Sequence, residues 1–326
     1  MSSKIHQVDE NYIKSIYKEI NEHIEDYQKD FNKDSEAFDS WSKTICNPKY
    51  KLIKNLVYLL EQNETTFHDK QIIFSIFNQL LIINQNVGNQ LKKFKYLPKI
   101  LVEYLLQFKQ DNKKIDLCAV STLSYSFNIE EYKNLLSIEL IEIIFDSLIK
   151  VKEENVIQNF IRIFIEINYI YKDIKDLKSN LFLQVYNINE HSNLVPEIAL
   201  RLLNQEKDNE FIIKILFCIK SLMDIKNKDV FYSKDLEAFI DIAVNFLEST
   251  EINEIRCGII DIIYNITRFD EFYNIKYKRK ELQELLEDCS KNDMVSIEVQ
   301  EKSQNILNNL NQKMKNDESN KNKNLE

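Results

Sequence analysis

The chain has 326 residues, of which 44% are hydrophobic, but only two glycines and three prolines. All-β folds need glycine and proline at their many turns, and nucleotide-binding α/β folds need glycines where backbone approaches phosphate. Both classes are therefore disfavoured. The formal net charge of −9 and the pI of about 5.3 also argue against a nucleic-acid-binding protein, since neutralising phosphates needs a basic surface.

Cysteine usage and hydropathy indicate the compartment. The five cysteines are odd in number, widely spaced and without a C-x-x-C motif, which is typical of a reduced, intracellular protein. The N-terminus lacks the apolar core of a signal peptide, and no run of about 18 apolar residues occurs. We therefore expect a cytoplasmic protein without a membrane span.

Apolar residues recur at helical spacing almost throughout. The first predicted helix runs from Val8 to Phe31 and a short second one from Ser35 to Cys46, so that residues 1–47 are predicted to form an N-terminal helical cap. Pro48 is expected to open the third helix, because proline is tolerated in a first turn. Short polar joints separate the helices that follow. The tail, 314–326, has no apolar stripe and is predicted to be disordered.

Four segments resemble one another and predict a repeat. They begin at Leu97, Ser137, Leu194 and Ser233, that is, 40, 57 and 39 residues apart. A period near 40 is typical of armadillo and HEAT units, which are about 40–47 residues long. The long gap is expected to hold an insertion or an extra helix pair. We predict an all-α, armadillo/HEAT-like helical-repeat superhelix that forms a single elongated domain, with the repeats at 48–313.

The C-terminal stripes predict a set of core residues. Gly258 falls within a predicted helix, where glycine is unfavourable, so we expect it to mark a close helix crossing. The apolar positions expected to be buried are Leu236, Phe239, Ile240, Ile259, Ile260, Ile263, Leu282 and Leu285.

Chemistry-bearing motifs are missing from the sequence. The four histidines have no i, i+4 pairing and flank no cysteine, and no G-x-S-x-G motif occurs. Metal sites and catalytic sites need such groups clustered on one face. We therefore expect no metal, no cofactor and no enzymatic activity, and predict a monomer that works by binding another protein.

Basic residues near the C-terminus are the candidate binding groups. All five arginines lie at residue 162 or later, and a basic cluster occupies the start of a predicted helix near residue 279. Arginine suits interfaces with carboxylates, but an arginine paired inside the fold is the alternative. The candidate partner-binding residues are Lys234, Asp235, Arg256, Arg268, Lys276, Lys278, Arg279 and Lys280.

The C-terminal half resembles a known family. The segment FYSKDLEAFIDIAVNFLE is similar to one in which WISH/DIP proteins carry an aromatic pair, a small polar pair and Asp-Leu before an apolar helix. The preceding NLVPEIALRLLNQEKDNEFIIKILFCIKSLM, the following IRCGIIDIIYNITRFDEFYNIKYKRKELQELLEDC, and IFIEINYIY resemble other segments of that family in order and spacing. The resemblance covers residues 155–310.

The resemblance implies a function. WISH/DIP proteins are armadillo-repeat activators of the actin-related protein 2/3 complex. They need no preformed filament and make the complex seed linear, unbranched actin filaments. The resemblance thus implies that this chain binds the complex, and indirectly acts on actin, at the actin cortex. An armadillo-type scaffold of another pathway is the alternative, although the single tryptophan, Trp41, disfavours a nuclear-import receptor.

Overall fold

The computed structural model describes residues 13–20, 22, 46 and 51–323, with gaps at 63, 85, 113, 128–131, 174–178, 190–191, 226–232, 268–271, 274–276 and 293–294. Within these ranges every regular element is a helix and there is no strand. The predicted all-α class is confirmed. The chain divides into two compact units, Met1–Ile163 and Phe164–Glu326.

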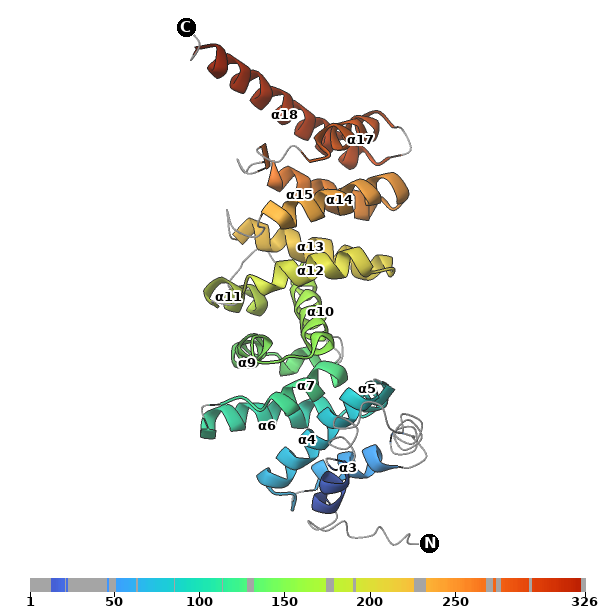
Figure 1. Ribbon diagram of the computed structural model, residues 1–326, viewed down its shortest axis with the longest axis vertical. Coiled ribbons are helices and arrows are strands. Elements are labelled where there is room, and N and C mark those ends of the chain that lie inside the picture. The colour runs from blue at the N-terminus through green and yellow to red at the C-terminus, as the bar shows by residue number, and fades with distance from the viewer. Residues whose placement is uncertain are drawn as a thin grey trace. The chain divides into compact units, whose positions relative to one another are not determined.

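The N-terminal unit consists of consecutive helices that pack on near neighbours in the sequence (Figure 1). α4 packs on α7, and α6 packs on both α7 and α9. Its elements are α3 (Leu52–Leu60), α4 (Phe67–Ile83), α5 (Asn86–Leu91), α6 (Leu97–Asn112), α7 (Leu117–Ser126), the 3₁₀ helix η2 (Lys133–Leu135), α9 (Ile138–Leu148) and the first part of α10 (Glu154–Ile170).

Only part of the predicted N-terminal cap can be compared with the structure. Residues 13–20 are helical, and the expected stripe members Ile13, Ile16 and Ile20 are buried. The rest of the first predicted helix and nearly all of the second lie outside the described residues, as does Pro48. The proposed domain boundaries, and the single elongated domain, stay predictions.

The C-terminal unit is built from helix pairs (Figure 1). In each pair the two helices contact each other. The first helices of successive pairs (α12, α14, α17) also pack on one another, as do the second helices (α13, α15, α18). This is the stacking of an armadillo-like helical repeat. The elements are α11 (Leu181–Ile188), α12 (Leu194–Gln205), α13 (Asn209–Ile225), α14 (Ser233–Ser249), α15 (Asn253–Ile266), α17 (Arg279–Lys291) and α18 (Ile297–Lys323).

The four predicted repeat starts coincide with helix starts. Leu97, Leu194 and Ser233 begin α6, α12 and α14, and Ser137 caps α9 by accepting a hydrogen bond from the backbone N–H of Leu140. The long gap holds an insertion, the short helix α11, whose cap Asn180 also donates to Asn168 Oδ1 at 2.9 Å.

Seven of the eight predicted core residues are buried, and Leu285 is the exception. Leu285 is half-buried, whereas the adjacent Leu286 is fully buried. In α17 the buried stripe runs through Leu282, Leu286 and Cys289, which is the i, i+4, i+7 spacing of one helix face. The prediction placed Leu282 correctly but chose Leu285, at i+3, instead of Leu286, at i+4.

The C-terminal helix extends further than expected. The backbone of α18 is helical to Lys323 and so includes most of the 314–326 segment that was predicted to be disordered. Extending an existing helix is much easier than nucleating one, and Lys and Glu are adequate helix formers. A polar segment can therefore continue a helix whose earlier turns are packed.

The burial of Leu286 instead of Leu285 in α17 gives a stability test. Leu286→Ala removes a fully buried side chain and should lower the free energy of unfolding by about 2–5 kcal/mol. Leu285→Ala, its half-buried neighbour, should cost clearly less. Denaturant unfolding of both variants checks this, and equal losses would contradict the observed register.

A buried thiol should limit stability in alkali. Cys218 in α13 is fully buried, and burial raises the pKa of its thiol from 9.0 to about 12. The folded state holds this proton more tightly than the unfolded chain. Its contribution to stability is therefore complete below pH 9 and is lost as the pH rises toward 12.

Above roughly pH 9.5, wild type should lose about 1.4 kcal/mol of unfolding free energy per pH unit more than Cys218→Ala, because only wild type carries this proton. Denaturant unfolding at a series of pH values measures both slopes. Parallel slopes would show that the thiol does not titrate differently in the two states.

Candidate protein-binding site

The predicted basic cluster does not form one surface. Arg268 and Lys276 lie outside the described residues. Lys234 is exposed and Asp235 half-buried in the first turn of α14, whereas Arg256 is half-buried in α15. The positive charge of Arg256 opposes the effect of burial, which raises the pKa of the Cys289 thiol in α17. Arg256 therefore faces the neighbouring helix pair.

Arg279 belongs to the fold. Its guanidinium Nη2 donates to the carbonyl oxygens of Phe272 and Tyr273, at 3.1 and 2.7 Å, and its Cζ lies 5.9 Å from the centre of the Phe272 ring. These contacts tie the start of α17 to the connection that precedes it. These contacts support the alternative of an arginine paired inside the fold, and a contact of Arg279 with a partner stays a prediction.

The two lysines beside Arg279 differ from each other. Lys278 Nζ lies 3.0 Å from Asp241 Oδ1 in α14, and the Tyr277 hydroxyl donates to both oxygens of the same carboxylate. The hydrogen bond to Asp241 raises the pKa of Lys278 and of Tyr277. Lys280, by contrast, has a side chain that is 91% exposed, and its ion pair with Glu284 is a weak surface pair. Among the described members of the predicted set, Lys234 and Lys280 are thus the exposed cations.

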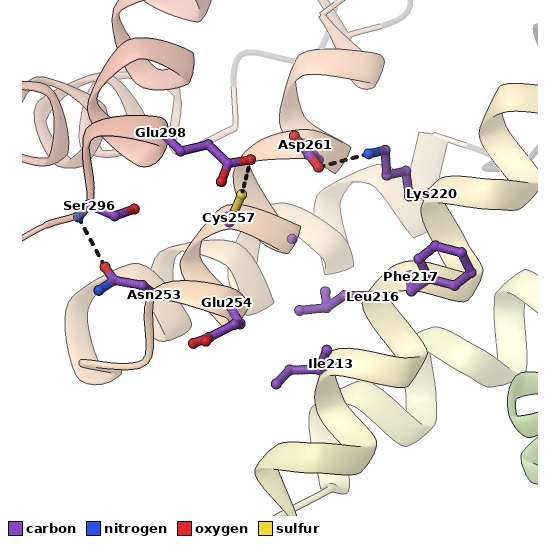
Figure 2. A pocket seen from close by; sticks show the side chains of 11 residues that line it. Ile213, Leu216, Phe217, Lys220, Asn253, Glu254, Cys257, Asp261, Ser296 and Glu298 are labelled. Atoms are coloured by element: carbon purple, nitrogen blue, oxygen red, sulfur yellow. Dashed lines mark hydrogen bonds and ion pairs between the residues drawn. The ribbon is translucent and has the colours of Figure 1, made fainter. Parts of the chain in front are cut away.

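The second helices of the C-terminal unit line a solvent-open cavity of about 410 Å³ that was not predicted from the sequence (Figure 2). α13 contributes an apolar wall, and α15 and α18 contribute most of the polar wall that faces it. The lining residues are Ile213, Leu216, Phe217, Lys220, Asn253, Glu254, Cys257, Gly258, Asp261, Ser296 and Glu298.

A glycine allows two of the helices that line this cavity to pack closely. A Cβ added at Gly258 would lie 3.0 Å from both Cβ and Cδ1 of Leu216, which is closer than ordinary van der Waals contact. Glycine therefore lets α13 and α15 approach closely at the base of the cavity. This agrees with the close helix crossing that was expected at this position.

The polar wall is held by a chain of charges across three helices. Lys220 of α13 and Lys302 of α18 both pair with Asp261 of α15, at 2.9 and 2.6 Å. Lys302 also lies 2.8 Å from Glu298 and donates to Cys257 Sγ. Cys257 in turn donates to Glu298 (Figure 2). Burial alone would lower the pKa of Lys302, but its hydrogen bonds to the two carboxylates outweigh this and raise the pKa.

The rim carries one carboxylate, that of Glu254, which takes no part in this set of ion pairs. Glu254 is exposed at the start of α15, and the described residues provide no ion pair for it. Next to it in sequence, Asn253 Oδ1 accepts a hydrogen bond from the backbone N–H of Ser296 at 3.2 Å, which joins the starts of α15 and α18. The rim is therefore fixed by internal contacts while Glu254 remains available.

A sequence signal for this site existed. Lys220, Asp261 and Lys302 alternate in charge and recur at the repeat spacing on the second helices. This signal lies in charges at equivalent positions of successive repeats and not in an unusual residue type such as arginine.

Comparisons with known proteins do not identify a family for this chain. No protein-family model and no curated protein matches the chain. A designed armadillo repeat protein, solved in complex with the peptide (KR)4, is 15% identical with a TM-score of 0.35, over 79% of this chain and 99% of that one. An engineered protein is 16% identical with a TM-score of 0.33, over 80% of this chain and 96% of that one. The armadillo-like class stated here rests on the helix pairing itself.

Two features are stated for the described ranges alone, a membrane-spanning helix and a metal-binding cluster. No helix there combines the length and the apolar character that crossing a membrane requires. No three His, Cys, Asp or Glu side chains in those ranges gather closely enough to hold a metal ion. That the protein is not an enzyme stays a prediction.

Arg279 and Lys280 offer a matched test of whether the side chain of Arg279 stabilises the fold. Arg279→Ala should cost about 1.5–3 kcal/mol of stability, because it removes a charged donor from two carbonyls. Lys280→Ala should stay within about 0.5 kcal/mol of wild type, since its side chain is solvated. Thermal unfolding monitored by circular dichroism compares them, and an unaffected Arg279→Ala would return Arg279 to the list of surface candidates.

Proposed function

We propose that this chain is a non-enzymatic scaffold that binds a partner protein through the second helices of its C-terminal unit. The observation that carries the proposal is the cavity shared by α13, α15 and α18. Stacked repeats use extended surfaces of this kind for binding. A cavity with an apolar wall and a few placed polar groups is the usual form of a binding site.

We further propose that the partner is the actin-related protein 2/3 complex, and that the chain activates it in the cytoplasm without a preformed filament. The support is the resemblance to WISH/DIP proteins over residues 155–310, which includes α12 to α17. Activation of this kind needs no catalysis. The chain would bind the active arrangement of the complex more tightly than the inactive one and so raise its population.

Actin assembly tests this proposal directly. With purified actin-related protein 2/3 complex and no added filaments, micromolar chain should shorten the lag of pyrenyl-actin assembly, and microscopy should show unbranched filaments. Without the complex it should have no effect. Failure to accelerate assembly in its presence would count against the WISH/DIP assignment and leave a scaffold of another pathway.

Charge reversal should locate the effect in the C-terminal unit. The variant Glu254→Lys should lower activation, because it reverses an exposed charge that lines the cavity at the start of α15. A matched reversal of an exposed carboxylate of the N-terminal unit, Glu103→Lys, should leave activation unchanged. The opposite order of effects would place the contact in the N-terminal unit.

A further inference from the structure

The cavity between α13, α15 and α18 has the size and lining of a side-chain pocket. Its volume of about 410 Å³ falls within the range of ligand sites, which is about 300–1,000 Å³, and exceeds that of one side chain. Ile213 and Phe217 of α13 are only half-buried and line it together with Leu216 (Figure 2). A bulky apolar side chain placed against this wall would bury apolar surface on both partners, as the anchors of protein interfaces do.

The charges of the lining select what can lie beside that anchor. Three carboxylates (Glu254, Asp261, Glu298) and one ammonium group (Lys220) line the cavity, and Lys302 lies behind them. Lys220, Lys302, Asp261 and Glu298 neutralise one another through short ion pairs. Glu254 is left as the charge that a ligand can reach. A ligand cation would pair with it, whereas a ligand carboxylate would meet Glu254 without compensation.

The rim also offers a backbone partner. Because Asn253 Oδ1 already accepts from Ser296, its amide Nδ2 can donate to a peptide carbonyl. We propose that this cavity binds a linear segment of a partner protein in which a bulky apolar residue is next to a lysine or arginine. The proposal rests on the proposed protein-binding function but not on the identity of the partner.

Synthetic peptides test the proposal with the full chain. The probes are fluorescent, capped peptides with Gly and Ser flanks and a central Phe-Lys, Phe-Glu or Ala-Lys, and the readout is anisotropy. Phe-Lys should bind most tightly. Ala-Lys should bind about tenfold more weakly for want of the anchor, and Phe-Glu about threefold or more weakly because its charge is wrong.

A charge swap makes the test specific to the rim. Glu254→Lys should reverse the preference, so that Phe-Glu binds more tightly than Phe-Lys. Glu248→Lys makes the same charge change at an exposed position of α14 and should leave the preference as in wild type. Both positions are exposed, so unchanged thermal unfolding is expected and serves as the folding control.

Cys257 reports where the peptide lies. Bound Phe-Lys peptide should slow the alkylation of Cys257, which lines the cavity, and leave Cys118, which is half-buried in the N-terminal unit, unaffected. Mass spectrometry of digested protein reads both sites.

Several results would overturn the pocket proposal. These are absence of binding by every peptide, a preference that Glu254→Lys does not reverse, or no protection of Cys257. A concentration-dependent dimer in sedimentation that Glu254→Lys abolishes would assign the cavity to a second copy and would also overturn it. If wild type accelerates actin assembly but binds no peptide, the pocket proposal alone fails. If it binds Phe-Lys as described but has no effect on actin, the proposed partner alone fails.

Discussion

The structure of the C-terminal unit depends on one constraint: a single helix pair cannot bury its apolar faces alone, so each pair must pack on the next. The stripe through Leu282, Leu286 and Cys289 in α17 is an instance. α17 packs both on its own partner α18 and on α14 of the preceding pair. Because the same requirement returns in every repeat, first helices stack on first helices and second helices on second helices.

This stacking decides where polar residues can be used. Where two second helices cross closely, the contact is made by small or apolar groups, as at Gly258 against Leu216. At the solvent edge of the same helices, charges meet across repeats, and Asp261 is shared by Lys220 and Lys302. The side chain of Asp261 is only 17% exposed, so its two cations compensate for the loss of hydration. The cavity lies between these two kinds of contact, so that one of its walls is apolar and the other is charged.

The fold could be predicted because its signals are local. The helix starts at Leu97, Leu194 and Ser233 follow from a polar joint before each apolar stripe. The signal for each start is therefore contained in a few consecutive residues. The register of α17 was harder, since Leu285 and Leu286 are equally apolar and only the neighbouring helices decide which one is buried.

The site could not be predicted in the same way. Whether Arg279 reaches a partner or the carbonyls of Phe272 and Tyr273 depends on the path of a connection that has no periodic pattern. The cavity needs residues from three helices, and a single helix gives no sign of it. Charges at equivalent positions of successive repeats were the available clue, but they become meaningful only once the second helices are known to be neighbours.

Hydrogen exchange of the full chain with and without purified actin-related protein 2/3 complex tests the central claim, that a protein partner docks on the second helices of the C-terminal unit. If the partner docks there, exchange should slow in the first turns of α15 and α18 and in the facing part of α13, where the cavity lies. Slower exchange confined to α12, α14 and α17, or to the N-terminal unit, would contradict it, as would unchanged exchange throughout.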